Sequence, residues 1–171
     1  MIKKYISEDY NKNVFNEFNN NWALITAGGK DGFNPMTVSW GGLGILWNKP
    51  VCTLYVRDSR KTLEYLKSHQ KLTLSFFGGD FKEELTKAGR CSGHDVKNKF
   101  ESCGLTPIYD VDADVYYAKE AKYVLKLTTL YMGHIDCEDI VEKSIVNNFY
   151  KDGDYHTVII ASIDQLLSNE E

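Results

Sequence analysis

The chain has 171 residues, of which 43% are hydrophobic and 26% charged, a composition typical of one globular domain with its own core. Its net charge of -4 and sequence pI of about 5.6 argue against a nucleic-acid-binding surface, and no basic stripe with interleaved aromatic residues is present. We therefore expect a single domain over residues 1–171 that does not bind nucleic acid.

The N-terminal residues, the longest uncharged run and the cysteines indicate where in the cell the protein is located. The N-terminal residues MIKKYISEDYN lack the apolar run of a secretory signal. The longest uncharged run, 34–48, is broken by proline and glycine, so we expect no membrane span. The four cysteines are expected to be reduced thiols, because a domain of this size needs no disulfides. These features together predict a cytoplasmic protein.

The predicted elements are mostly consecutive strands. In chain order we expect strands at 22–27, 36–40, 50–56, 71–77, 115–117, 122–135 and 155–163. Helices are expected at 9–19, 63–66 and 138–150, with one or two short ones between 80 and 104. Because strands follow one another rather than alternate with helices, the pattern favours an antiparallel barrel with peripheral helices over a doubly wound parallel sheet. No G-x-G-x-x-G follows a strand, as a dinucleotide-binding fold would require.

The strand at 36–40 ends in a glycine-rich segment that suits a ligand. Thr37 and Ser39 lie two residues apart and are expected on one strand face. The glycines that follow, Gly41, Gly42 and Gly44, lack the side chains that keep a ligand away from the backbone. The alternative is that these glycines only relieve a bend at a barrel corner.

The segment RDSRKT, residues 57–62, has the composition of a phosphate site. It joins a strand to a helix, whose first N–H groups favour an anion. Arg57 and Arg60 offer forked, charged donors, and Ser59 and Thr62 offer hydroxyl groups. The alternative is that Ser59 is the N-cap of the helix while both arginines face water.

The stretch NPMTVSWGGLGILWNKPVCTLYVRDSRKTLEYL resembles the N-terminal half of flavin reductase-like proteins with the FMN-binding split barrel. The later CSGHDVKNKFESCGLTP resembles their Ser-Gly-x-Asp-x-x-x-Lys-Phe segment, and DGDYHTVIIASIDQLL resembles their last strand. The similarity extends from about Trp22 to Leu167. It implies a mainly β fold, a split antiparallel β-barrel with peripheral helices, usually assembled as a homodimer with FMN near the subunit interface.

The resemblance also implies which residues would contact FMN. Those near the ring would be Asn34, Met36, Thr37, Val38, Ser39, Trp40, Gly41, Phe76, Phe77 and Gly78. Those expected to hold the phosphate are Arg57, Ser59, Arg60 and Thr62, and a nearby loop would supply Ser92, Gly93 and Lys99.

The activity implied by the resemblance is NAD(P)H-dependent flavin reduction, with electrons passing to free flavin or to an acceptor protein. NADH and NADPH are both open as donors. The alternatives are an FMN-bound electron carrier, similar to flavoredoxin, and a non-catalytic small-molecule-binding module. The chemistry would belong to the flavin, so the protein needs no nucleophile of its own.

Two further groups of residues are candidates for chemistry. His156 lies at the start of the last predicted strand and is the one candidate catalytic residue, as a donor or proton shuttle, with a histidine hydrogen-bonded at a strand end as the alternative. Cys91, His94 and Cys103 do not form the two close pairs typical of a zinc site, so we expect no metal. Cys91 or Cys103 could instead lie near the flavin as a thiol, or be buried.

Overall fold

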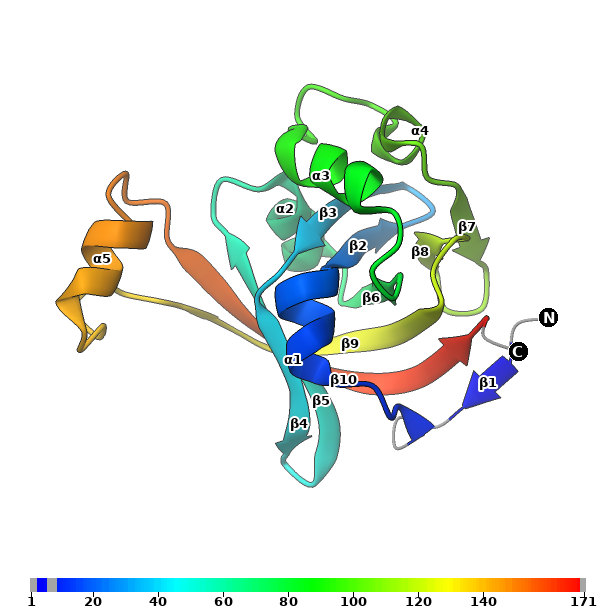
Figure 1. Ribbon diagram of the computed structural model, residues 1–171, viewed down its shortest axis with the longest axis horizontal. Helices are drawn as coiled ribbons and strands as arrows, with labels where there is room; N and C mark the ends of the chain where they lie inside the picture. Colours follow the sequence, from blue (N-terminus) through cyan, green and yellow to red (C-terminus); the bar gives the residue numbers. More distant parts are fainter. Residues whose placement is uncertain (1–2, 6–8, 170–171) are drawn as a thin grey trace.

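The computed structural model describes residues 3–5 and 9–169, in which antiparallel strands are the main regular structure (Figure 1). The strands are β1 (Lys3–Tyr5), β2 (Ala23–Gly29), β3 (Gly32–Val38), β4 (Gly41–Leu46), β5 (Lys49–Arg57), β6 (Lys71–Phe76), β7 (Pro107–Asp110), β8 (Val115–Ala118), β9 (Tyr123–His134) and β10 (His156–Ser168). The helices are α1 (Val14–Asn16), which continues into the π-helical turn η2 (Glu17–Asn21), α2 (Lys61–Ser68), α3 (Lys82–Arg90), α4 (Lys99–Cys103) and α5 (Lys143–Phe149).

The main sheet curls because its two end strands are neighbours in the chain. Its strand order is β3-β2-β6-β9-β10-β5-β4, with β1 paired to β10. The ends of this path, β3 and β4, are separated only by Ser39 and Trp40. Three residue steps from Val38 to Gly41 span at most about 11 Å, so the two ends must approach each other there. This arrangement confirms the predicted split antiparallel barrel with peripheral helices.

Two cores are packed on the two faces of this sheet. On β2, Ala23, Ile25 and Ala27 face the first core, whereas Leu24 faces the second. Helix α2 adds to the first core through Leu63 and Leu66, and the second core lies among α3, α4 and the β7–β8 hairpin. Because both faces are buried, β2 is a continuous apolar run rather than an alternating one.

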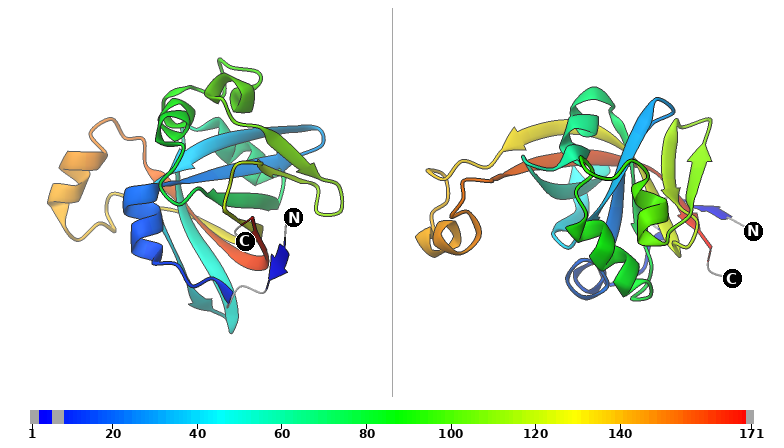
Figure 2. Two further views of the ribbon diagram at one scale, coloured as in Figure 1. Left: turned by 45° about the vertical axis from the view of Figure 1, so that its right-hand side comes forward. Right: turned by 90° about the horizontal axis from the view of Figure 1, so that it is seen from above.

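Helix α5 stands apart from the rest of the molecule. The ends of β9 and β10 extend beyond the barrel, and α5 lies at their far end, away from the body in all views (Figures 1 and 2). None of its residues is buried. We call residues 135–155, which carry this helix between the two strands, the arm.

Several predicted boundaries were wrong. The strand expected at 36–40 runs from Gly32 to Val38, so Ser39 and Trp40 lie beyond its end. The glycines of residues 41–46, expected either to let a ligand approach the backbone or to relieve a bend, belong to strand β4, which was not predicted and pairs with β5. The helices expected at 9–19 and 138–150 are shorter or shifted, and the hairpin strand β7 was missed. Ser59 is not the N-cap of α2, because that position is Arg60 and Ser59 binds another residue.

Candidate functional site

An open pocket of about 220 Å³ lies where β3 leaves the barrel. Strand β3 and the Ser39–Trp40 crossing form one side, and the ends of β5 and β10 form the other. Arg57 and His156 are directly paired across β5 and β10, so their side chains project from the same face of the sheet. We call this the split pocket, and its lining is Met36, Thr37, Val38, Ser39, Trp40, Tyr55, Arg57, Arg60 and His156.

A smaller and more enclosed pocket of about 30 Å³ adjoins it. The two pockets share Met36 and Arg60. The start of α2 and the loop between α3 and α4 form its walls. We call this the cation pocket, and its lining is Asn34, Met36, Ser59, Arg60, Lys61, Thr62, Cys91, Ser92, Gly93 and Lys99.

Buried polar groups fix the floor of the cation pocket. The Asn34 side-chain amide donates to the Thr62 hydroxyl oxygen at 2.7 Å, and both residues are buried. The Thr62 hydroxyl can then donate its own proton to a ligand. Gly93 lies against Asn34 so closely that a Cβ atom there would come within 2.1 Å of the Asn34 side-chain oxygen. This contact requires glycine at position 93 and holds the loop over the pocket.

Lys99 is the residue that most clearly needs a ligand. It is only 4% exposed and lines the cation pocket together with Arg60. Burial lowers the pKa of Lys99, and the neighbouring Arg60 guanidinium also acts to lower it. No carboxylate lines the pocket in the part of the chain that the structure describes. Burying an ammonium group without an anionic partner is costly, so the pocket is suited to an anion.

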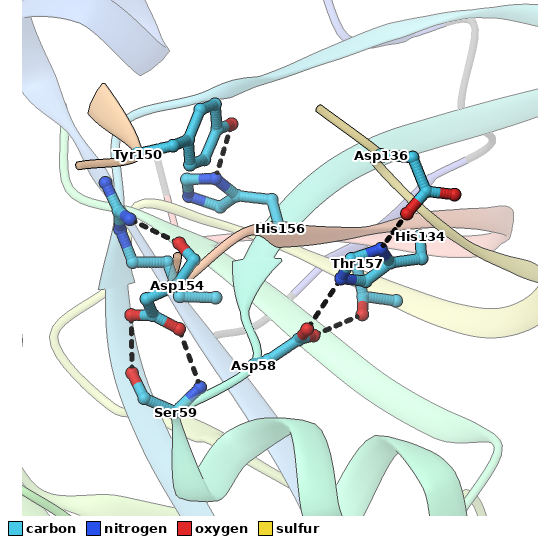
Figure 3. A network of polar contacts seen from close by, with 9 residues as sticks. Asp58, Ser59, His134, Asp136, Tyr150, Asp154, His156 and Thr157 are labelled. Carbon is cyan, nitrogen blue, oxygen red and sulfur yellow. Dashed lines mark hydrogen bonds and ion pairs between the residues drawn. The ribbon is translucent and has the colours of Figure 1, made fainter. Parts of the chain in front are cut away.

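His156 is buried at the base of the split pocket, where it is held by the arm. Its Nδ1 lies 2.8 Å from the hydroxyl oxygen of Tyr150 (Figure 3), and its ring packs 5.1 Å from that of Trp40. Burial, together with the Arg57 charge, lowers the pKa of His156 to about 4, so the imidazole is neutral at pH 7. Burial raises the pKa of Tyr150. We therefore assign the phenol as the donor to Nδ1, which leaves the imidazole proton on Nε2.

Two of the predicted phosphate ligands already have partners in the arm. The Asp154 carboxylate accepts from the Ser59 backbone N–H at 3.0 Å and from the Ser59 hydroxyl at 2.7 Å (Figure 3). Arg57 donates to the backbone carbonyls of Asp154 and Phe149. These bonds attach the arm to the start of α2. They leave Arg60, Thr62 and Lys99 as the groups most available to an anion.

A second network fixes the root of the arm. The His134 ring nitrogens lie 2.7 Å from an Asp58 carboxylate oxygen and 3.2 Å from one of Asp136 (Figure 3). The Thr157 hydroxyl also donates to Asp58 at 2.8 Å. The hydrogen bond to Asp58, followed by that to Asp136, raises the pKa of His134. The His134 imidazole thus links the end of β9 to the turn before α2.

Most of the predicted site residues gather in the two pockets, but four do not. Phe76 and Phe77 are fully buried, one in each core. Gly78 lies against the Lys122 side chain, and Gly41 packs against Phe18, outside both pockets. Thr37 lines the split pocket, although its hydroxyl donates to the Leu85 carbonyl of α3 at 2.5 Å.

Three residues near the site were not predicted from the sequence: Tyr55, Tyr150 and Asp154. Tyr55 could have been found, because it lies two residues before Arg57 and therefore shares its strand face. Tyr150 and Asp154 had no such signal. Asp154 reaches the site because the arm folds back beside Ser59, 95 positions earlier in the chain, and Tyr150 reaches it by bonding His156, six positions later.

Three further findings concern the cysteines, metal-binding side chains and the helices. Cys103 is buried, and burial, followed by the electrostatic effect of the neighbouring Cys91, raises its pKa. Within residues 3–5 and 9–169, no group of three or more metal-binding side chains comes together. Within the same ranges, no helix has the length and apolar character needed to cross a membrane.

Comparison with solved structures identifies the fold. A flavin reductases-like enzyme with an FMN-binding domain from Shewanella baltica OS155 superposes with a TM-score of 0.71 at 15% identity, over 98% of this chain and 77% of that one. Flavoredoxin of Desulfovibrio vulgaris (Miyazaki F) superposes with a TM-score of 0.67 at 19% identity, over 97% of this chain and 78% of that one. The NADH:FAD oxidoreductase SgcE6 of Streptomyces globisporus C-1027 superposes with a TM-score of 0.64 at 13% identity, over 90% of this chain and 78% of that one.

The chain therefore has the split-barrel fold of FMN-binding, flavin reductase-like proteins, as the sequence resemblance predicted. No protein-family model matches the sequence. No curated protein is detectably similar to it in sequence.

The two networks of the arm predict opposite titration of His156 and His134. We expect the His156 imidazole to titrate near pH 4 and the His134 imidazole above the ordinary value of about 6.5, as measured by NMR of the ring C–H signals. Because the unfolded chain binds a proton at His156 more readily, the free energy of unfolding should fall as the pH drops from about 6.5 toward 4. The contribution of His134 to the free energy of unfolding depends on pH in the opposite direction. It is lost as the pH rises through the raised pKa of His134.

Tyr150→Phe tests the assignment of the His156 proton, and Tyr155→Phe is the matched control on the same arm. Tyr150 and Tyr155 stack at 4.6 Å, but the hydroxyl group that bonds His156 belongs to Tyr150. We expect only Tyr150→Phe to change the ¹⁵N shift pattern that reports the His156 tautomer. A His156 signal that titrates near pH 6.5 in the unmodified protein would contradict the assignment.

Proposed function

We propose that the protein is an FMN-binding oxidoreductase. NADH or NADPH would reduce the bound flavin, and the electrons would then pass to free flavin or to an acceptor protein. The observation that carries this proposal is Lys99, a buried cation beside Arg60 in a pocket without a described carboxylate. The fold supports it, since solved structures with this fold include FMN-binding flavin reductase-like enzymes and an NADH:FAD oxidoreductase.

The residues of the two pockets suit the two ends of FMN. Arg60 and Lys99 would neutralise the phosphate charge, and the Thr62 hydroxyl, oriented by Asn34, would donate to a phosphate oxygen. In the split pocket, Met36, Val38 and Trp40 offer apolar surface for a flat ring. His156 would donate from Nε2 to a polar edge of that ring and stay neutral as it does so.

The chain's own part in the chemistry is to bind and orient the flavin and to exclude water from it. When bound, FMN would supply hydride transfer, which none of the side chains of the pockets provides. The positive charge of Arg57 and Arg60 near the split pocket favours the reduced, more electron-rich form of a bound flavin. The neutral His156 preserves a hydrogen-bond donor across the physiological pH range.

An electron carrier is the second candidate function. Flavoredoxins are among the structures that share this fold at similar TM-scores. Such a protein would use the same FMN site without a nicotinamide donor of its own. Activity measurements distinguish the two functions.

Lys99→Met tests the phosphate assignment, with Lys97→Met as the matched control, because Lys97 is exposed and two residues away. Loss of one charged hydrogen bond, about 1.5–3 kcal/mol, corresponds to roughly 10- to 150-fold weaker FMN binding in isothermal titration calorimetry. Riboflavin lacks the phosphate, so its affinity should not depend on Lys99. Equal FMN affinity in both variants would refute the assignment.

The anaerobic visible spectrum of the FMN-loaded protein tests the activity. Prompt bleaching of the flavin band on addition of NADH or NADPH is the expected result and identifies the donor. Bleaching by dithionite alone would leave the electron carrier as the function. A flavin band identical to that of free FMN would indicate that the pockets bind something else.

We also propose that the protein is a homodimer that uses the arm as its interface. Helix α5 has seven residues and no buried side chain, and so short a helix is not stable in water without packing. The arm also exposes apolar residues, with Val141 95% and Phe149 47% exposed. A second copy of the chain would cover these side chains.

Val141→Asp tests this interface, with Val111→Asp as the control, because Val111 is 75% exposed on the distant β7–β8 hairpin. We expect sedimentation equilibrium to show a dimer for the unmodified chain and for Val111→Asp, and a weakened dimer for Val141→Asp. A monomeric unmodified chain would refute the proposal.

A further inference from the structure

Helices α3 and α4 bring two cysteines to the region of the cation pocket. Cys91 directly follows α3 and lines the pocket, and Cys103 is the last residue of α4. Ala88 of α3 and Cys103 belong to the same core, where the two helices meet (Figure 1). Because Cys91 comes three residues after Ala88, the two lie on the same side of α3. Cys91 is therefore on the side of α3 that faces Cys103.

Lys99 connects the two thiols to the pocket. It is four residues before Cys103 in α4, so these two side chains lie on one face of that helix. Lys99 and Cys91 line the same pocket, which has a volume of about 30 Å³. The electrostatics agree with this placement, since burial lowers the pKa of Lys99 whereas Cys103 and, less strongly, Cys91 act to raise it. The two thiols and the ammonium group thus form one cluster.

The two cysteines differ as the members of a reacting thiol pair should. Cys91 is half-buried at the pocket wall, whereas Cys103 is 1% exposed. Reactive cysteines are typically partly exposed and have cationic neighbours. Arg60, Lys61 and Lys99 line the pocket, and among the described residues no carboxylate does. Burial, and after it Cys91, raises the pKa of Cys103, so an oxidant that enters the pocket meets Cys91 first.

We propose that Cys91 and Cys103 form a disulfide when a peroxide enters the cation pocket, and that an anion bound in the pocket prevents this. The Cys91 sulfur attacks one oxygen of hydrogen peroxide, the O–O bond breaks, and a sulfenic acid and water form. The Cys103 sulfur then attacks the sulfenic sulfur and the S–O bond breaks. The Cys103 proton leaves with that oxygen as water. Two electrons pass from the two thiols to the peroxide, which yields one disulfide and two water molecules.

Occupancy of the pocket decides whether the reaction occurs. A phosphate group bound by Arg60 and Lys99 would lie against Cys91 and shield its sulfur from the oxidant. The inference rests on the proposed function, because FMN is the anion that the pocket is proposed to bind. A reduced flavin that meets dioxygen gives hydrogen peroxide, so the proposed activity would also supply the oxidant. The empty protein is then the form that is oxidised.

The test treats the unmodified protein with hydrogen peroxide alone, with FMN, and with riboflavin, which lacks the phosphate. Trypsin places Cys91 in the peptide 91–97 and Cys103 in the peptide 100–119. Mass spectrometry of the unreduced digest therefore detects the disulfide as the two joined peptides. Cys52 is fully buried, so its oxidation would report unfolding.

Cys103→Ser tests the order of the two steps, and Cys137→Ser is the matched control, because Cys137 is an exposed thiol on the arm. We expect Cys91 to stop at the sulfenic acid in Cys103→Ser, where dimedone traps it. Cys137→Ser should form the disulfide as fast as the unmodified chain does. With FMN at about ten times its dissociation constant, mass action predicts roughly tenfold slower disulfide formation, and riboflavin should not slow it.

The proposal is overturned if the peptides 91–97 and 100–119 are not joined, or are joined only when Cys52 is oxidised as well. It is also overturned if FMN binds without slowing the reaction, or if FMN and riboflavin slow it equally. If the protein binds no FMN in calorimetry but inorganic phosphate slows disulfide formation, the proposed function fails while the thiol pair and its protection by an anion stand. If neither FMN nor phosphate slows the reaction, protection by an anion is refuted.

Discussion

The two-residue crossing from β3 to β4 is the constraint on which the other features depend. These strands stand at opposite ends of the strand path, yet Ser39 and Trp40 alone connect them. Closing the path through so short a link forces the sheet to curl and brings its two end strands together. The link itself cannot pair with a neighbour as the strands do. Its two residues line the split pocket and also a second pocket of about 780 Å³ that is formed with residues 11–19.

The strand content of the fold could be predicted because β-branched and aromatic runs mark β2, β5, β6, β9 and β10. Strand β4 could not, because its sequence GGLGIL lacks alternation and its glycines suggest a bend. It is a strand because the turn at Trp47 and Asn48, with φ values of 52° and 56°, folds it back onto β5. Such a turn favours hairpins, but a tryptophan is an unusual residue for it. Tertiary pairing thus overrode the local signal.

The site was predictable where its residues are close in sequence. Residues 34–40 and 57–62 each form a continuous motif, and the structure brings both to one place. Prediction failed for Phe76 and Phe77 because both are buried in the cores: Phe76 ends β6, whose two faces are buried, and Phe77 follows it into the second core. It also missed the arm residues that bond Arg57, Ser59 and His156. The bonds to Arg57 and Ser59 join segments 92 to 97 positions apart in the chain, and no local pattern encodes such a distance. Tyr150 lies only six positions before His156, but nothing in its local sequence marks it as the partner.

The Asp154 carboxylate is one of the groups that connect the arm to the start of α2. It holds the arm, and it also takes both hydrogen-bond donors of Ser59 at the edge of the cation pocket. An anion that accepts hydrogen bonds from the Ser59 N–H and hydroxyl groups must displace the Asp154 carboxylate. Conversely, a movement of the arm that withdraws Asp154 leaves these two donors available to an anion. By thermodynamic reciprocity, each event changes the free energy of the other by the same amount. Occupancy of the pocket and the position of the arm are therefore linked equilibria, with a single carboxylate as the shared group.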